Sequence, residues 1–155
     1  MLFQEFLIAA NKGSTVYNVG DRNLNSGLHS ANSARVTLNN HDAGVIKPFL
    51  LAADHPAVPT LGFAPKYIKL VWNFETPSFT TATILFRYDE ISARDASMLR
   101  LMRYNLSAQT WVRVPIVWES SGLRFTASNL PPLGASNLGF FALVELPAPT
   151  LFLVK

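Results

Sequence analysis

The sequence predicts an all-β domain with the architecture of an Ig-like antiparallel β-sandwich. Apolar and polar side chains alternate in short stretches across residues 67–145, which is typical of sheets with one buried and one wet face. Turn residues separate these stretches at short intervals. Residues 91–98, where Asp95 can cap one helical turn, are too few for a stable helix.

The composition fits one globular domain. A chain of 155 residues is long enough to bury a core, and 49% hydrophobic against 15% charged residues argues against disorder. Pro147 and Pro149 mark a boundary. We therefore expect a single sandwich domain over residues 1–146, followed at 147–155 by a linker or the start of another segment.

The N-terminal half predicts four strands and two irregular segments. Residues 3–10, 15–19 and 34–38 alternate as strands, and 21–32 form a long polar loop. Pro48 makes residues 45–53 an edge or broken strand, because proline cannot donate to a ladder. Three further prolines make 54–66 an irregular crossover. The inward side chains of the third strand are Ala34, Val36 and Leu38.

The second half predicts the core. Alternation assigns inward and outward positions to each strand, with a hairpin at 104–111 and a Pro-rich loop at 129–136. On the outward side, Tyr67, Lys69 and Asn73 face water or a second layer. The expected inward residues are Ile68, Leu70, Trp72, Phe74, Ala82, Ile84, Phe86, Tyr88, Leu99, Leu101, Val112, Val114, Leu123, Phe125, Ala127, Phe141 and Leu143.

Six stretches of the second half carry a family resemblance: YIKLVWNF, ATILFRYD, LRLMRYN, WVRV, FTA and FFALV. Together they resemble the β-sandwich repeat module of large bacterial surface proteins, which are commonly exported by the type IX system. STVYNVG and ARVTLNN resemble its earlier strands more loosely, and Leu70 stands where the module usually has Arg. The resemblance implies a structural or adhesive role at an extracellular or cell-surface location.

Charge and cysteine content exclude several classes of function. The net charge of +3 is spread without a run of like charges, so no nucleic-acid partner is expected. No apolar run approaches the roughly 20 residues of a membrane helix, so no membrane insertion is expected. The absence of cysteine excludes disulfides, thiolate metal sites and a Cys nucleophile.

We expect no catalytic, metal or cofactor-binding residues, and therefore no enzyme. The nucleophile-elbow, Walker and dinucleotide patterns are missing. His29, His41 and His55 lie in predicted loops without the spacing of a zinc site, which favours solvent-exposed histidines. Acidic residues at 89, 90 and 95 raise the possibility of a calcium loop, but they lack the D-x-D-x-D-G pattern, which favours a solvated turn.

Two tryptophans are candidate ligand contacts. Trp111 and Trp118 fall out of the apolar phase, so they are either surface aromatics that stack on a glycan or partners in cross-strand packing, which we favour. Four arginines fall on successive predicted strands, either as one outward ladder or, as we favour, as a solvated face. These arginines are Arg87, Arg100, Arg113 and Arg124.

The sequence thus favours a non-enzymatic structural or adhesive module that acts in assembly or recognition. Its partners would be neighbouring modules, or further copies of the chain, paired through edge strands at 45–53 and 150–155. Leu151, Phe152 and Leu153 are then expected to be packed or paired. Two alternatives remain, a carbohydrate-binding module of a secreted enzyme and a jelly-roll coat or filament subunit, because fold alone does not choose among them.

Overall fold

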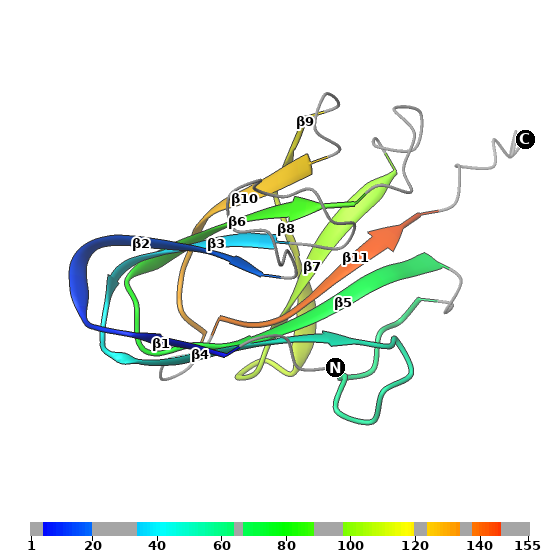
Figure 1. Ribbon diagram of the computed structural model, residues 1–155. Helices are drawn as coiled ribbons and strands as arrows, with labels where there is room; N and C mark the ends of the chain where they lie inside the picture. Colours follow the sequence, from blue (N-terminus) through cyan, green and yellow to red (C-terminus); the bar gives the residue numbers. More distant parts are fainter. Residues whose placement is uncertain are drawn as a thin grey trace, which may run out of the picture.

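The computed structural model confirms an all-β sandwich (Figure 1). It describes residues 5–19, 34–63, 67–88, 98–119, 124–133 and 138–146, and within these ranges it contains eleven strands and no α-helix. The strands are β1 (Phe6–Ile8), β2 (Asn11–Val19), β3 (Ala34–His41), β4 (Gly44–Leu51), β5 (Ile68–Glu75), β6 (Thr81–Arg87), β7 (Leu99–Asn105), β8 (Thr110–Val114), β9 (Val117–Glu119), β10 (Arg124–Leu130) and β11 (Gly139–Glu145).

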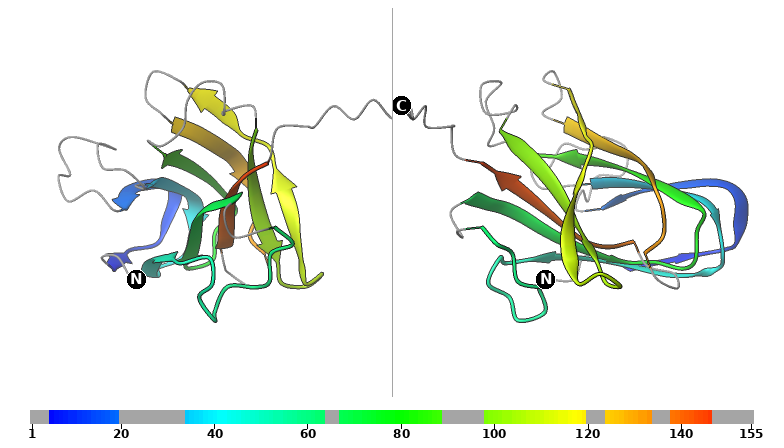
Figure 2. Two further views of the ribbon diagram at one scale, coloured as in Figure 1. Left: turned by 90° about the vertical axis from the view of Figure 1, so that its right-hand side faces the viewer. Right: turned by 180° about the vertical axis from the view of Figure 1, so that it is seen from behind.

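The strands form two antiparallel sheets, which Figure 2 shows from two further sides. The six-stranded sheet has the order β1-β4-β5-β11-β7-β8, and the five-stranded sheet has the order β2-β3-β6-β10-β9. Each sheet buries one face against the other, as strands with a period of two require. The outermost described strands are therefore β1 and β8 in one sheet and β2 and β9 in the other.

Short connections join the two sheets along both sides of the sandwich. Only residues 9–10 separate β1 from β2, and only 42–43 separate β3 from β4, so a two-stranded ribbon bends from one sheet into the other (Figure 1). On the opposite side, Pro115 and Ile116 lead from β8 to β9. Each side of the sandwich is thus bordered by two edge strands that follow each other in the chain.

Aromatic side chains fill the space between the sheets. Phe86 and Phe125 of the five-stranded sheet stack with ring centroids 5.1 Å apart. Phe86 also lies 6.0 Å from Phe141 and 6.4 Å from Phe74, which belong to the six-stranded sheet. Trp72 stacks on Phe74 at 5.3 Å. The predicted inward phase of all five residues is confirmed, since each is at most 1% exposed.

Ile68 is an exception to the predicted phase. The pairing of β11 with β5 shifts between Leu143, which lies opposite Leu70, and Val144, which lies opposite Ile68. Lys69 is the extra residue, so the strand carries a bulge that turns the next side chain to the other face. Ile68 therefore packs on the outside of the six-stranded sheet, and its predicted place in the ladder with Leu70 is wrong.

The predicted burial of Val112 on β8 also needs correction. Val112 is 49% exposed, while Val114 packs partly buried against the core. β8 is the last described strand of its sheet, and no described strand flanks its outer side. The alternation therefore gave the pairing with β7 correctly, but it overestimated how deeply this edge is buried.

The strand with Pro48 is second in its sheet rather than at the edge. It pairs with β5, where Pro48 lies opposite Phe74, and with β1, whose described pairing reaches from Gly44 to Ile46. Pro48 thus lies beyond the described pairing with β1, so on that side of the strand its missing N–H interrupts no described ladder. The prediction of an edge strand is wrong for residues 45–46, while the strand itself is confirmed.

The structure also tests several of the other predicted segments. The hairpin at 104–111 is confirmed, and β10 continues to Leu130, two residues into the predicted Pro-rich loop. The polar loop at 21–32, Leu123 and the segment 147–155 with Leu151, Phe152 and Leu153 lie outside the described residues, and so does all but the last residue of the predicted turn at 91–98. So do His29, Asp89, Glu90 and Asp95.

Candidate functional site

The outer face of the five-stranded sheet is polar. Thr37 of β3 pairs with Thr83 of β6, and Arg124 of β10 lies between Arg87 and Glu119 in register. Arg100 and Arg113 belong to β7 and β8 of the other sheet. The four arginines that fall on successive strands therefore do not form one ladder. Only Arg87 and Arg124 lie on this sheet, where they contribute to its polar outer face.

The outer face of the six-stranded sheet is apolar and covered. Val71, Ala142 and Val144 are at most 1% exposed although they point away from the central core. Half-buried side chains of the crossover at 53–63 and of neighbouring strands pack over them, and we call this group the outer cluster. The sequence predicted that the outward side of these strands faces either water or a second layer, and the outer cluster is such a second layer. A sequence signal for it exists, because β5 and β11 contain consecutive apolar residues, as strands buried on both faces do.

Trp111 belongs to the outer cluster. Its indole Nε1 donates a hydrogen bond of 3.1 Å to the carbonyl oxygen of Thr60, which ties β8 to the crossover. Its ring lies 5.3 Å from that of Tyr104, its register partner on β7. The cross-strand packing that we favoured for Trp111 is therefore present, and the indole stays half-buried.

Trp118 lies in a different place. It stands on β9 opposite Phe125 and packs, half-buried, against the main core between the sheets. The structure therefore does not bring Trp111 and Trp118 onto one face. Trp111 instead shares its face with two other half-buried aromatics, Phe49 and Phe140, which are both register partners of Asn73.

His41 is buried rather than exposed, which corrects the expectation of a loop histidine. It ends β3 and is 3% exposed. Its Nδ1 lies 2.8 Å from the carbonyl oxygen of Asp42, which can only accept, so Nδ1 carries a proton there. Its Nε2 lies 2.7 Å from Thr15 Oγ1, to which Asn11 Nδ2 donates at 3.2 Å. The contact of Nε2 with Thr15 therefore helps to join β3 to β2, while Nδ1 ties the ring to the residue that follows β3.

Replacing Thr15 with Val tests this role. The change removes the hydroxyl but keeps the shape, so the buried Nε2 of His41 loses its partner. We expect the free energy of unfolding to fall by about 1 to 3 kcal/mol, the usual cost of an unsatisfied buried polar group. Urea denaturation measures this loss. A change in Thr15→Val no larger than in Thr80→Val, at an exposed position, would contradict a structural role for His41.

His55 lies on the exposed crossover, as expected. Its Nδ1 accepts a hydrogen bond of 3.1 Å from the amide of Ala57. The crossover borders an open cavity of about 360 Å³ whose lining includes His55, Phe63 and Ile68.

Within the ranges that the structure describes, no three His, Cys, Asp or Glu residues lie close enough to hold a metal ion. No helix in these ranges is long and apolar enough to cross a membrane.

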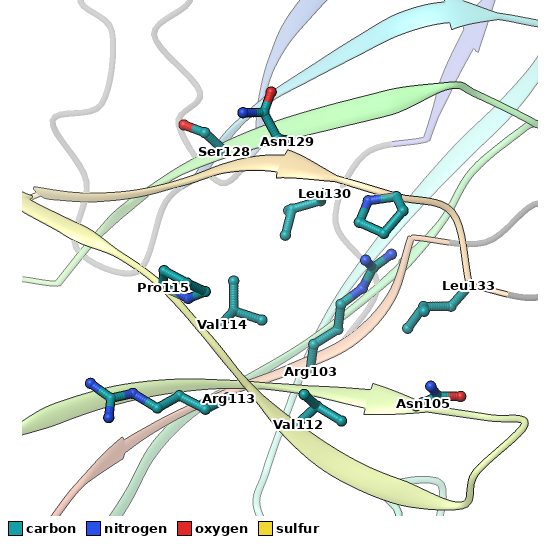
Figure 3. A pocket seen from close by; sticks show the side chains of 11 residues that line it. Arg103, Asn105, Val112, Arg113, Val114, Pro115, Ser128, Asn129, Leu130 and Leu133 are labelled. Carbon is teal, nitrogen blue, oxygen red and sulfur yellow. The ribbon is translucent and has the colours of Figure 1, made fainter.

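A second cavity, of about 250 Å³, lies between the sheets at the side bordered by β8 (Figure 3). Its walls are largely apolar, and they come from β8, from the end of β10 and from the segment that follows it. One charged side chain, Arg103 of β7, projects between these walls (Figure 3). The apolar lining residues are Val112, Val114, Pro115, Leu130, Pro131 and Leu133.

Arg103 occupies an inward position of its strand, in phase with Leu99 and Leu101, and is 4% exposed. Its Nε and Nη2 donate to the carbonyl oxygen of Leu138 at 3.2 and 3.0 Å, and its guanidinium lies 5.4 Å from the ring centroid of Phe141. Burial lowers the pKa of Arg103 to about 10. Arg103 was not among the residues that we expected to be functional. The sequence did carry a signal for a buried charge, because Arg103 is a charged residue at an inward position of a strand whose other inward residues are Leu99 and Leu101.

The exposed large apolar side chains gather at the sides of the sandwich. Of the six among the described residues, Leu7, Val16, Val112 and Val117 stand on the four outermost strands. Val45 is the register partner of Leu7. Only Leu106 lies elsewhere, at the tip of the hairpin between β7 and β8.

Comparison of the chain with protein-family models, curated proteins and solved structures found no match in any of the three.

Proposed function

We propose that this chain is a non-enzymatic structural or adhesive module of a bacterial cell-surface or secreted protein. It acts at an extracellular or cell-surface location, and it associates through its edge strands with neighbouring modules or further copies. The observation that supports this function is the placement of exposed aliphatic side chains, one on each of the four outermost strands. The resemblance of residues 67–145 to a surface-protein repeat module agrees with it.

Edge strands with apolar side chains favour association for two reasons. Their outer backbone N–H and C=O groups are a template for another strand, and apolar side chains beside them add surface that is buried on contact. Soluble sandwich proteins usually protect such edges with charges, prolines or bulges. Here Leu7 is 84% exposed on β1 and Val117 is 68% exposed on β9, at opposite sides of the molecule. A module with two such sides can join a partner at each one.

Lysine substitutions on the two sides test this function. We expect the wild-type chain to self-associate with rising concentration in sedimentation velocity experiments. Leu7→Lys and Val117→Lys each place a charge at an edge, so each variant should shift the distribution toward the monomer. Leu106→Lys is the matched control, because Leu106 is 51% exposed but lies at a hairpin tip. A wild-type chain that stays monomeric, or an equal effect of Leu106→Lys, would contradict association through the edges.

A carbohydrate-binding module is the second candidate, and one observation favours it. Trp111, Tyr104, Phe140 and Phe49 are half-buried aromatics on one outer face, and flat aromatic surfaces are what sugar rings stack on. Titration with oligosaccharides tests it. Quenching of tryptophan fluorescence that is lost in Trp111→Ala but kept in Trp118→Ala would favour this candidate over edge-strand assembly.

A further inference from the structure

Arg103 carries a charge that the fold itself leaves unmatched. At neutral pH a guanidinium is protonated even when burial weakens its basicity. Among the described residues, no carboxylate forms an ion pair with Arg103, and the carbonyl oxygen of Leu138 is its one hydrogen-bond acceptor. Buried charges are usually paired, because removing an ion from water costs several kcal/mol that one carbonyl group offsets only in part.

The guanidinium has an open donor on the side of the cavity. Nε and Nη2 both bond to the carbonyl oxygen of Leu138, whereas Nη1 has no acceptor among the described residues and is not sealed from solvent. Figure 3 shows the side chain extended between the walls of the cavity, while that of Arg113 points away from it. Phe141 and the Leu138 carbonyl hold the guanidinium in place, so it is preorganised for an incoming acceptor.

The cavity limits the size of what it can admit. Its volume of about 250 Å³ lies between the roughly 150 Å³ of an engineered cavity that binds benzene and the roughly 300 Å³ at which pockets for drug-sized ligands begin. The cavity therefore suits one ring or a short aliphatic chain. Its apolar walls, formed in part by Val112, Val114 and Leu130, suit an apolar body rather than a fully hydrated one.

We propose that this cavity binds a small carboxylate, with the carboxylate oxygens on the guanidinium of Arg103 and an apolar body against Val114, Leu130 and Leu133. A carboxylate matches the planar fork of arginine. A phosphate dianion fits less well, because it is more strongly hydrated, and of the two arginines at the cavity only Arg103 extends between the apolar walls. This site lies beside the edge strand β8, whose Val112 and Val114 line it, and the ligand that we propose for it goes beyond the assembly function proposed above.

Benzoate and its neutral analogue benzamide are the probes. They share the ring, and only benzoate has the charge. NMR titration of the intact chain, followed at the Nε–H signal of Arg103, should show benzoate binding at least about tenfold more tightly than benzamide, as a charge-assisted hydrogen bond implies. Inorganic phosphate should bind more weakly than benzoate. Equal affinities for benzoate and benzamide, shifts confined to other arginines, or phosphate binding as tight as that of benzoate would overturn the proposal.

Two variants test whether benzoate binds at Arg103. Arg103→Met keeps the length of the side chain and removes the charge, so the preference for benzoate over benzamide should disappear. Arg113→Met makes the same change in an exposed arginine at the same cavity and should leave the preference unchanged. A benzoate preference retained in Arg103→Met would overturn the proposal. If Arg103→Met does not fold, the wild-type comparison of the two probes still decides the question.

Discussion

Replacing Phe86 with Ala is expected to lower the free energy of unfolding by about 3 to 5 kcal/mol, the usual cost of deleting a buried aromatic ring. Phe86 stacks on Phe125 in its own sheet and contacts Phe141 of the opposite sheet, so its loss leaves a cavity where the two sheets meet. Trp72→Ala, which removes the ring stacked on Phe74, is expected to cost a similar amount. Urea or guanidinium denaturation measures both.

Leu106→Ala serves as the control for these two variants. Leu106 is exposed at the hairpin tip, so its change should stay within about 0.5 kcal/mol. Trp72 offers a further check, because its indole is 1% exposed. In a Trp111→Phe, Trp118→Phe background its fluorescence should report an apolar site in the folded chain. An emission typical of a water-exposed indole would show that the assigned strand phase is wrong.

Replacing Val144 with Asp is expected to destabilise the fold by more than about 3 kcal/mol, because it buries an unpaired carboxylate in the outer cluster. Val144 is fully buried on the outer face of the six-stranded sheet, where the crossover and neighbouring strands cover it. A sandwich whose outer faces are both wet would accept this change at little cost. The experiment therefore measures whether the outer cluster is a true second layer.

Thr83→Asp is the matched control on the other sheet. Thr83 lies on the outer face of β6 opposite Thr37, in polar surroundings, so the same carboxylate should cost about 1 kcal/mol or less. Thermal melting and urea denaturation of both variants give the comparison. Similar losses in Val144→Asp and Thr83→Asp would show that the crossover at 53–63 does not seal the outer face.

The strand phases could be predicted because alternation is a local property of the chain. Ala34, Val36 and Leu38 are fully buried, as a period of two predicts for a half-buried strand. Ile68 was misplaced because a bulge is a feature of two paired strands, and it is visible only when the register with β11 is known. The placement of β4 within its sheet likewise depended on a partner, β1, that lies far from it in sequence.

The candidate sites were less predictable than the fold. Arg103 stands in the apolar phase of its strand, but only the arrangement of β7 against the end of β10 places this buried cation beside a cavity. His41 was placed in a loop because β3 was expected to end at residue 38, whereas it continues to His41 and pairs there with Asn11. Each of these errors concerns a contact between segments that are distant in the chain.

The sequence by itself determined the all-β class, the position of most strands and the residues between the two sheets, because side-chain alternation and turn residues act over a few neighbouring positions. Only the tertiary structure decided which segment covers the outer face of the six-stranded sheet, that exposed aliphatics line the edges, and that Arg103 lies buried beside a cavity. These features arise from pairings between distant strands. The free energy of such pairings depends on how whole surfaces fit, which no local pattern encodes.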